Sequence, residues 1–142
     1  MLPTIIFDLN RTLLNPETND KYSDSLSVLN FCQNKDYQLL LVAQAVDGRT
    51  ELVRKLFEGY FANTYFVANK SAKLFRDIVK RHNINLGESF VVGDRAQKEL
   101  LFGHRVGFKT IWLQHDKFAH EYPKQFVPTY TIQHLRELPK LI

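Results

Sequence analysis

Apolar residues gather in five short runs along the chain, and each run is followed by polar or turn-forming residues. The runs lie at positions 5–7, 38–43, 64–67, 89–92 and 109–113. Apolar residues in these runs occupy consecutive positions more often than alternating ones. That pattern is typical of strands that are buried on both faces of a parallel sheet. A further short strand is predicted at 130–132.

The segments between these runs carry apolar residues at the spacing of amphipathic helices. The first helix is expected to begin near Ser23 or Asp24, because either side chain can cap an N-terminus, and to end at 34–36. Turn-forming residues predict a loop at 15–20 and a turn at 44–48. The remaining helices are expected at about 50–60, from about 71 to near 83, through 100–101 to near 107, and as a final turn at 135–138.

This alternation of strands and helices predicts an α/β fold. We expect a single domain over residues 1–142, with a Rossmann-like parallel sheet in a three-layer α/β/α arrangement and right-handed crossovers. About one helix separates the first strand from the second, and about one separates the second from the third. The chain therefore has no room at these two connections for a cap domain.

Composition narrows the class of protein. The chain has 142 residues, of which 44% are hydrophobic, so it can bury a core. No apolar run approaches the roughly 20 residues of a membrane helix, and no signal peptide is visible. The single cysteine, Cys32, cannot form an internal disulfide, which fits a cytoplasmic location. The net charge of +4 favours anionic ligands such as phosphates, and without a nucleic-acid motif a nucleic-acid partner is not expected.

Polar side chains follow several of the predicted strands. Asp8, Gln44, Lys70 and Asp94 each come after a strand. Because the carboxyl ends of parallel strands share one edge of the sheet, we expect these four residues to meet there. Two carboxylates suit a hard cation such as Mg²⁺, a lysine can neutralise a phosphoryl group, and a free carboxylate can be a nucleophile. The residues alone thus indicate magnesium-assisted phosphoryl transfer.

In this order, the motifs resemble those of the haloacid dehalogenase (HAD) superfamily. The sequence Asp8-Leu9-Asn10-Arg11-Thr12-Leu13 is similar to the D-x-D-x-T-L motif of that family, and Lys70 and Gly93-Asp94 match its later lysine and Gly-Asp motifs. Residues 103–113 and the ending at 128–139 are also similar. The resemblance covers nearly the whole chain and implies a small, capless HAD-like hydrolase of the phosphatase type.

Carried over position by position, the resemblance implies roles for individual residues of this chain. Asp8 would be the nucleophile and Lys70 the phosphate-neutralising lysine, with Lys73 as a second candidate for the lysine. The implied Mg²⁺ ligands are Asp8, the Asn10 carbonyl, Asp94 and Glu99. The implied phosphate-binding residues are Asn10, Arg11, Thr12, Gln44 and Lys70, with Thr12 also supporting the loop.

The departures from the family pattern bear on activity. Asn10 stands where the family has its acid-base aspartate, and an amide cannot donate and recover a proton as a carboxyl group does. General acid-base catalysis contributes about 10²–10⁴-fold. Arg11 replaces a frequent glycine, Ala43 or Gln44 replaces a phosphate-binding serine or threonine, and Glu99 replaces an aspartate.

Two main functions follow from these matches and departures. The first is a Mg²⁺-dependent phosphohydrolase of reduced power, acting through an aspartyl-phosphate on Asp8. The alternative is a catalytically inactive binding or regulatory protein with a HAD fold. The absence of a cap implies large or exposed phosphorylated substrates, or a homo-oligomer whose second subunit covers the site. Dehalogenation is disfavoured because it needs a closed apolar pocket, and dinucleotide binding because no G-x-G-x-x-G follows the first strand.

Overall fold

A computed structural model describes residues 1–46 and 48–142. Its strands are β1 (Thr4–Phe7), β2 (Leu14–Asn15), β3 (Asp20–Lys21), β4 (Gln38–Gln44), β5 (Asn63–Val67), β6 (Phe90–Gly93), β7 (Lys109–Leu113) and β8 (Tyr130–Ile132). The α-helices are α1 (Ser25–Asn34), α2 (Thr50–Leu56), α3 (Ala72–Arg81) and α4 (Glu99–Val106), and the 3₁₀ helices are η1 (Leu86–Glu88), η2 (Asp116–Phe118) and η3 (Leu135–Lys140).

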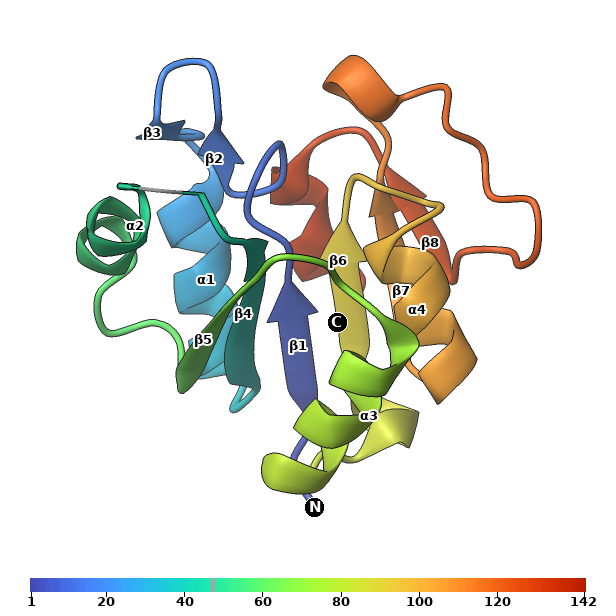
Figure 1. The fold of residues 1–142 in the computed structure, drawn as a ribbon. Helices are drawn as coiled ribbons and strands as arrows, with labels where there is room; N and C mark the ends of the chain where they lie inside the picture. The colour runs from blue at the N-terminus through green and yellow to red at the C-terminus, as the bar shows by residue number, and fades with distance from the viewer. Residues whose placement is uncertain (47) are drawn as a thin grey trace.

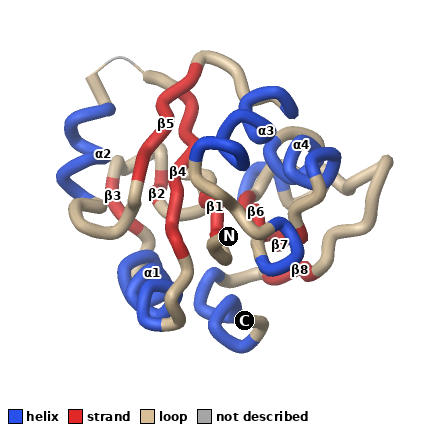
Figure 2. The backbone as a smooth tube through the Cα atoms, turned by 90° about the horizontal axis from the view of Figure 1, so that it is seen from below, coloured by secondary structure: helices blue, strands red, loops and turns tan. Residues whose placement is uncertain are grey.

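Six strands form one parallel sheet in the order β5-β4-β1-β6-β7-β8. The helices cover both faces of this sheet, as Figures 1 and 2 show: α1, α2 and η3 lie on one side, and α3 and α4 on the other. This arrangement confirms the predicted three-layer α/β/α fold.

The consecutive apolar residues of β1 explain why it is the central strand. Ile5 and Phe7 point into the core on the side of α1, and Ile6 points into the core on the side of α3. All three are at most 1% exposed. The chain moves outward from β1 to β4 and β5, returns to β6, and continues to β7 and β8. The strand order therefore reverses beside β1, and a crevice for ligands is expected beyond its carboxyl end.

The connections beside β1 contain no cap domain within the described residues. The β2–β3 ribbon and α1 join β1 to β4, and α2 joins β4 to β5. No helix in the described part of the chain is long and apolar enough to cross a membrane.

Two predicted elements need correction, and one predicted residue cannot be placed. The loop expected at 15–20 begins and ends in the antiparallel β2–β3 ribbon, whose two-residue strands are too short to show a period. The helix expected at 50–60 ends at Leu56 because Phe57 leaves the helical conformation and Gly59 has φ 86°. Leu52, an apolar residue of α2, is 37% exposed. Asp47, in the turn predicted at 44–48, lies outside the described residues.

Candidate active site

A pocket of about 380 Å³ opens at the carboxyl end of the sheet, above β1. Its base holds Asp8, Asp94 and Glu99, which are between 2% and 6% exposed, together with Lys70. The other lining residues are Asn10, Arg11, Gln44, Ala68, Asn69, Arg95, Lys98, Phe102 and Phe118. The structure thus brings together Asp8, Gln44, Lys70 and Asp94, as the strand pattern predicts.

Backbone contacts with the sheet fix the position of Asp8. It follows Phe7 directly, and its backbone N–H donates to the carbonyl of Val92 in β6 at 2.9 Å. The carboxylate therefore projects from the end of the central strand and is not free to move with the following loop. Thr12 is fully buried and does not line the pocket, and its hydroxyl lies 3.5 Å from Asp8 Oδ2. That placement suits loop support better than contact with a ligand.

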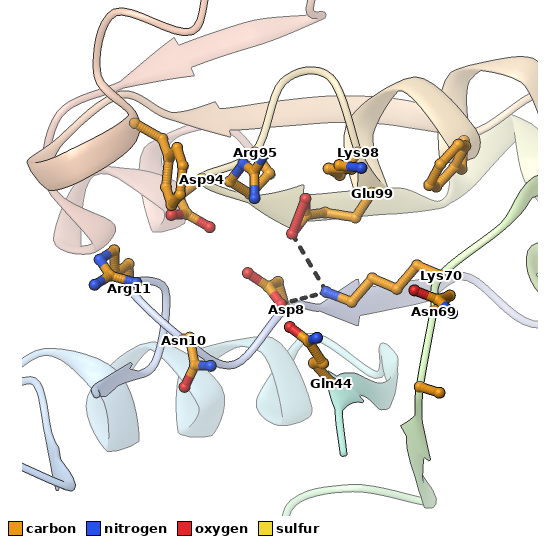
Figure 3. Close-up of a pocket in the computed structure, with 13 residues that line it drawn as sticks. Asp8, Asn10, Arg11, Gln44, Asn69, Lys70, Asp94, Arg95, Lys98 and Glu99 are labelled. Carbon is orange, nitrogen blue, oxygen red and sulfur yellow. Dashed lines mark hydrogen bonds and ion pairs between the residues drawn. The ribbon is translucent and has the colours of Figure 1, made fainter. Parts of the chain in front are cut away.

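Lys70 bridges two of the buried carboxylates (Figure 3). Its ammonium donates to Asp8 Oδ1 and, at 3.3 Å, to Glu99 Oε1. Lys70 lies just before α3, whose first turn is capped by the Ser71 hydroxyl accepting from the backbone N–H of Leu74 at 3.1 Å. Lys73, the other candidate for the motif lysine, is exposed on α3 and does not line the pocket.

Local packing explains the Gly-Asp motif. A Cβ atom on Gly93 would lie 2.7 Å from Glu99 Cγ, so only glycine lets the Glu99 side chain fold back over the end of β6. The Trp112 indole N–H donates to the Asp94 carbonyl at 3.1 Å, which ties the motif to β7. These contacts hold Asp94 and Glu99 near the end of the same strand.

Electrostatics differ sharply among the three carboxylates. Burial alone would raise the pKa of Asp8, but the Lys70 ammonium and hydrogen bonds from Glu99 and Asp94 lower it overall. Burial and the nearby Asp8 charge raise the pKa of Asp94 to about 10 and that of Glu99 to about 8. Burial would also lower the pKa of Lys70, but Asp8 and Glu99 raise it overall. An ionised Asp8 therefore lies beside two carboxyl groups that need a further positive charge before they ionise.

The donor set fits a divalent cation. Asp8, Asp94 and Glu99 each offer an oxygen, and these oxygens lie within 4.8 Å of one another. Because hard divalent cations such as Mg²⁺ take carboxylate oxygens as ligands, these three residues would hold such an ion. Among the described residues, neither Asp94 Oδ1 nor Glu99 Oε2 has a hydrogen-bond partner. Two buried, unpaired carboxylate oxygens are costly unless a ligand satisfies them.

Asn10 is held by a residue that the sequence did not single out. The Arg49 guanidinium donates from Nη2 to Asn10 Oδ1 at 3.0 Å. Because a guanidinium only donates, this contact fixes the amide oxygen on the Arg49 side and leaves the amide N–H₂ as a donor. Asn10 can therefore hydrogen-bond an oxygen of a ligand in the pocket but cannot transfer a proton to it.

Three rim residues were also missing from the sequence prediction. Arg95 and Lys98 belong to the loop after Asp94, so their nearness to Asp94 in the sequence could have indicated that they line the site. Phe118 comes from η2, after β7, and no sequence pattern connects it with Asp8. His115, which also follows β7, contacts the backbone carbonyl of Arg11 through Nε2. The segment after β7 thus contacts the loop after β1.

Comparison with known proteins identifies the family of this chain. Residues 67–138, about half of the chain, match the family model described as HAD-hydrolase-like. The chain belongs to the HAD-hydrolase-like family. Both the predicted family and the predicted fold are therefore confirmed, and the matched region contains Lys70, Asp94 and Glu99.

Known relatives of this HAD-hydrolase-like chain include a phosphatase. The glyceraldehyde 3-phosphate phosphatase of Pyrococcus furiosus is 32% identical over 73 residues, which are 49% of this chain and span only 28% of that enzyme's length. A HAD phosphatase structure from Thermococcus onnurineus is 22% identical with a TM-score of 0.70, covering 86% of this chain and 58% of that one. A HAD-superfamily hydrolase of subfamily IA from Geobacter sulfurreducens is 12% identical with a TM-score of 0.74, covering 100% of both chains.

Proposed function

We propose that this chain is a Mg²⁺-dependent phosphohydrolase that acts through an aspartyl-phosphate on Asp8. The observation that carries the proposal is the contact of Lys70 with Asp8, which keeps a buried carboxylate ionised at the end of the central strand. An ionised carboxylate in a pocket is a competent nucleophile towards phosphorus. The relationship to a phosphatase supports the same reaction class.

The residues of the chain divide the work between them. Asp8, Asp94 and Glu99 would hold the Mg²⁺, which when bound supplies positive charge to the transferring phosphoryl group. Lys70 adds a second positive charge at the base of the pocket, and the Asn10 amide and Gln44 are neutral hydrogen-bond donors at its wall. Asp8 attacks phosphorus, and the leaving group departs on the side opposite Asp8.

The site lacks the usual proton donor, so the reaction is restricted. Besides the three carboxyl groups at the base, the described lining residues include no carboxyl group and no histidine. An alkoxide leaving group would depart unprotonated, at a cost of about 10²–10⁴-fold in rate. Turnover should therefore be confined to phosphates with stable leaving groups.

Hydrolysis of p-nitrophenyl phosphate with and without Mg²⁺ tests this proposal. The wild type should release p-nitrophenolate only with Mg²⁺, and Asp8→Asn should abolish release. Asp77→Asn is the matched control, because Asp77 is an exposed carboxylate on α3 outside the pocket. Turnover that survives in Asp8→Asn would refute the role of Asp8.

The second candidate is a binding or regulatory protein that keeps the fold without turnover. Asn10 and Ala43 favour it, since each removes a chemical group from a different motif. It predicts that phosphate or a phosphorylated ligand binds with Mg²⁺ while neither p-nitrophenolate nor a phosphoenzyme forms. A single domain, a cytoplasmic location, a large or exposed substrate and a homo-oligomer that covers the open pocket stay predictions.

A further inference from the structure

The rim of the pocket carries three cationic side chains that the chemistry at the base does not use. Arg11 comes from the loop after β1, and Arg95 and Lys98 come from the loop between β6 and α4 (Figure 3). Unlike the carboxylates at the base, Arg95 is half-buried and Lys98 is exposed. These cations therefore surround the mouth of the pocket, where a bound molecule passes from buried surroundings to solvent.

One aromatic ring holds two of these cations together. The Arg95 guanidinium lies 3.9 Å from the centroid of Phe118, and that of Arg11 lies 5.7 Å from the same centroid. His115 adds a contact with the Arg11 backbone carbonyl. The segment after β7 thus holds two guanidinium groups at one edge of the pocket, where their like charges favour an anion between them.

Acidic neighbours neutralise these cations only in part. Arg95 pairs with Glu121 at 3.0 Å, whereas Arg11 reaches Asp116 only at 3.9 Å. The Arg11 Nε–H is buried and has no hydrogen-bond partner among the described residues. Lys98 is in no ion pair that the described residues form. The rim therefore keeps a net positive charge, and the described residues leave the Arg11 Nε–H without an acceptor and Lys98 without an ion-pair partner.

The rim lies where a leaving group would be. In phosphoryl transfer the attacking and leaving oxygens are roughly in line through phosphorus. Asp8 attacks from the buried base, so the leaving group points towards the mouth and its cations. Asn10 supplies no proton there, and its amide oxygen is already held by Arg49. The leaving group must therefore depart as an anion.

From these observations, and resting on the proposed function, we infer that the substrates are phosphoric anhydrides, whose leaving group is a carboxylate or a phosphate bound by Arg11, Arg95 and Lys98. Acyl phosphates and diphosphates belong to this class. Both release an anion that is stable without a proton, so the missing acid carries little cost, and both place that anion at the cationic rim.

The bonds and charges balance without an added acid. An Asp8 oxygen forms a bond to phosphorus, the bond from phosphorus to the bridging oxygen breaks, and the departing carboxylate or phosphate keeps the electron pair. Water then attacks phosphorus in the aspartyl-phosphate, the bond to Asp8 breaks, and the protons of that water leave with the inorganic phosphate. Asp8 is regenerated as a carboxylate.

The test compares kcat/KM for acetyl phosphate and inorganic pyrophosphate with that for p-nitrophenyl phosphate, with glycerol 1-phosphate as the ester with a poor leaving group. Lys98→Gln should lower kcat/KM for acetyl phosphate and pyrophosphate about fivefold, the upper range for one exposed ion pair. Lys98→Glu should lower it about tenfold or more, because it adds repulsion. Lys80→Gln, an exposed lysine on α3 outside the pocket, is the matched control and should change nothing.

The readout that decides is the ratio of the two anhydride values to the p-nitrophenyl phosphate value. The inference requires that this ratio fall in the Lys98 variants and that glycerol 1-phosphate remain the poorest substrate. An unchanged ratio, or a preference for glycerol 1-phosphate, would overturn the inference. The proposed function would still stand if hydrolysis of p-nitrophenyl phosphate depended on Asp8. If wild type turns over none of the four compounds with Mg²⁺, both the proposed function and the inference fail.

Discussion

Replacing Asn10 by aspartate places a titratable carboxyl group where the family has its acid-base residue, but this chain places Arg49 beside it. The Arg49 Nη2 is 3.0 Å from Asn10 Oδ1, and the new carboxylate can accept the same hydrogen bond as an ion pair. An opposite charge at this range lowers the pKa of a carboxyl group by about 1–3 units. The substituted residue would therefore be ionised at neutral pH, which suits a general base and not a general acid.

The magnitude follows from that pKa. Each unit by which the pKa falls reduces the protonated fraction about tenfold at neutral pH. General acid-base catalysis raises a rate by about 10²–10⁴-fold. By lowering the pKa of the new carboxyl group, Arg49 would remove about 10–10³-fold of the rate gain that comes from general acid catalysis. We expect Asn10→Asp to speed hydrolysis of the aspartyl-phosphate about 100-fold and to speed cleavage of an alkyl phosphate no more than about tenfold. Adding Arg49→Gln should raise alkyl phosphate cleavage a further tenfold or more.

Rapid-quench kinetics separate the two steps. With p-nitrophenyl phosphate, the wild type should release one equivalent of p-nitrophenolate quickly and then turn over slowly, because no base assists the second step. Asn10→Asp should remove this burst by raising the slow rate, and Asn30→Asp, an exposed amide on α1, should not. Equal alkyl phosphate cleavage in Asn10→Asp and in the double variant would refute the role assigned to Arg49.

Four further predictions concern the metal site and the core. The pKa values of Asp94 and Glu99 are raised to about 10 and about 8, so Mg²⁺ must displace protons when it binds. Its affinity, measured by calorimetry, should therefore increase from pH 6 to pH 8. An affinity that does not change with pH would contradict this prediction. The same raised pKa values mean that the metal-free folded state binds more protons than the unfolded state above about pH 4.5. The free energy of unfolding of the metal-free protein, measured by urea titration, should therefore fall as pH rises towards 8. Saturating Mg²⁺ should restore it. A free energy of unfolding that rises with pH would contradict the raised pKa values of Asp94 and Glu99. Gly93→Ala should displace Glu99 and weaken Mg²⁺ binding about tenfold or more, which unchanged binding in calorimetry would exclude. Phe75→Ala, at a fully buried ring in the core, should cost about 3–5 kcal/mol in urea unfolding, and a loss below about 1 kcal/mol would show that the ring is not packed as described.

The central sheet could be predicted from the sequence because its main strands are marked by runs of apolar residues. The run 5–7 is apolar at consecutive positions, and the structure buries Ile5, Ile6 and Phe7 between two helical layers. The polar residues that come after these parallel strands then lie together at one edge of the sheet. Asp8, Lys70 and Asp94 could therefore be assigned to one site before any contact was known.

The rim of the pocket could not be predicted, because it depends on contacts between distant segments. Phe118 reaches Arg11 and Arg95 only when the segment after β7 folds back over the loop after β1. Arg49 lies at the start of α2, and nothing in its neighbourhood along the chain points to Asn10. Such contacts carry no periodic signal.

Short and irregular elements escaped prediction for a related reason. The β2 and β3 strands have two residues each, so alternation cannot be read from them. The end of α2 depends on the conformations of Phe57 and Gly59, while the apolar spacing continues to Tyr60 and suggests a longer helix. Apolar spacing predicts which residues are buried better than it predicts where a helix ends.

The central claim is that Asp8 becomes phosphorylated, and mass spectrometry can observe it directly. Wild type, Asp8→Asn and Asp77→Asn would be mixed with p-nitrophenyl phosphate and Mg²⁺, quenched in acid and digested. We expect one phosphoryl group on the peptide that contains Asp8 in the wild type and in Asp77→Asn, and none in Asp8→Asn. A phosphoryl group on another residue, or turnover with no phosphorylated Asp8 at any quench time, would contradict it.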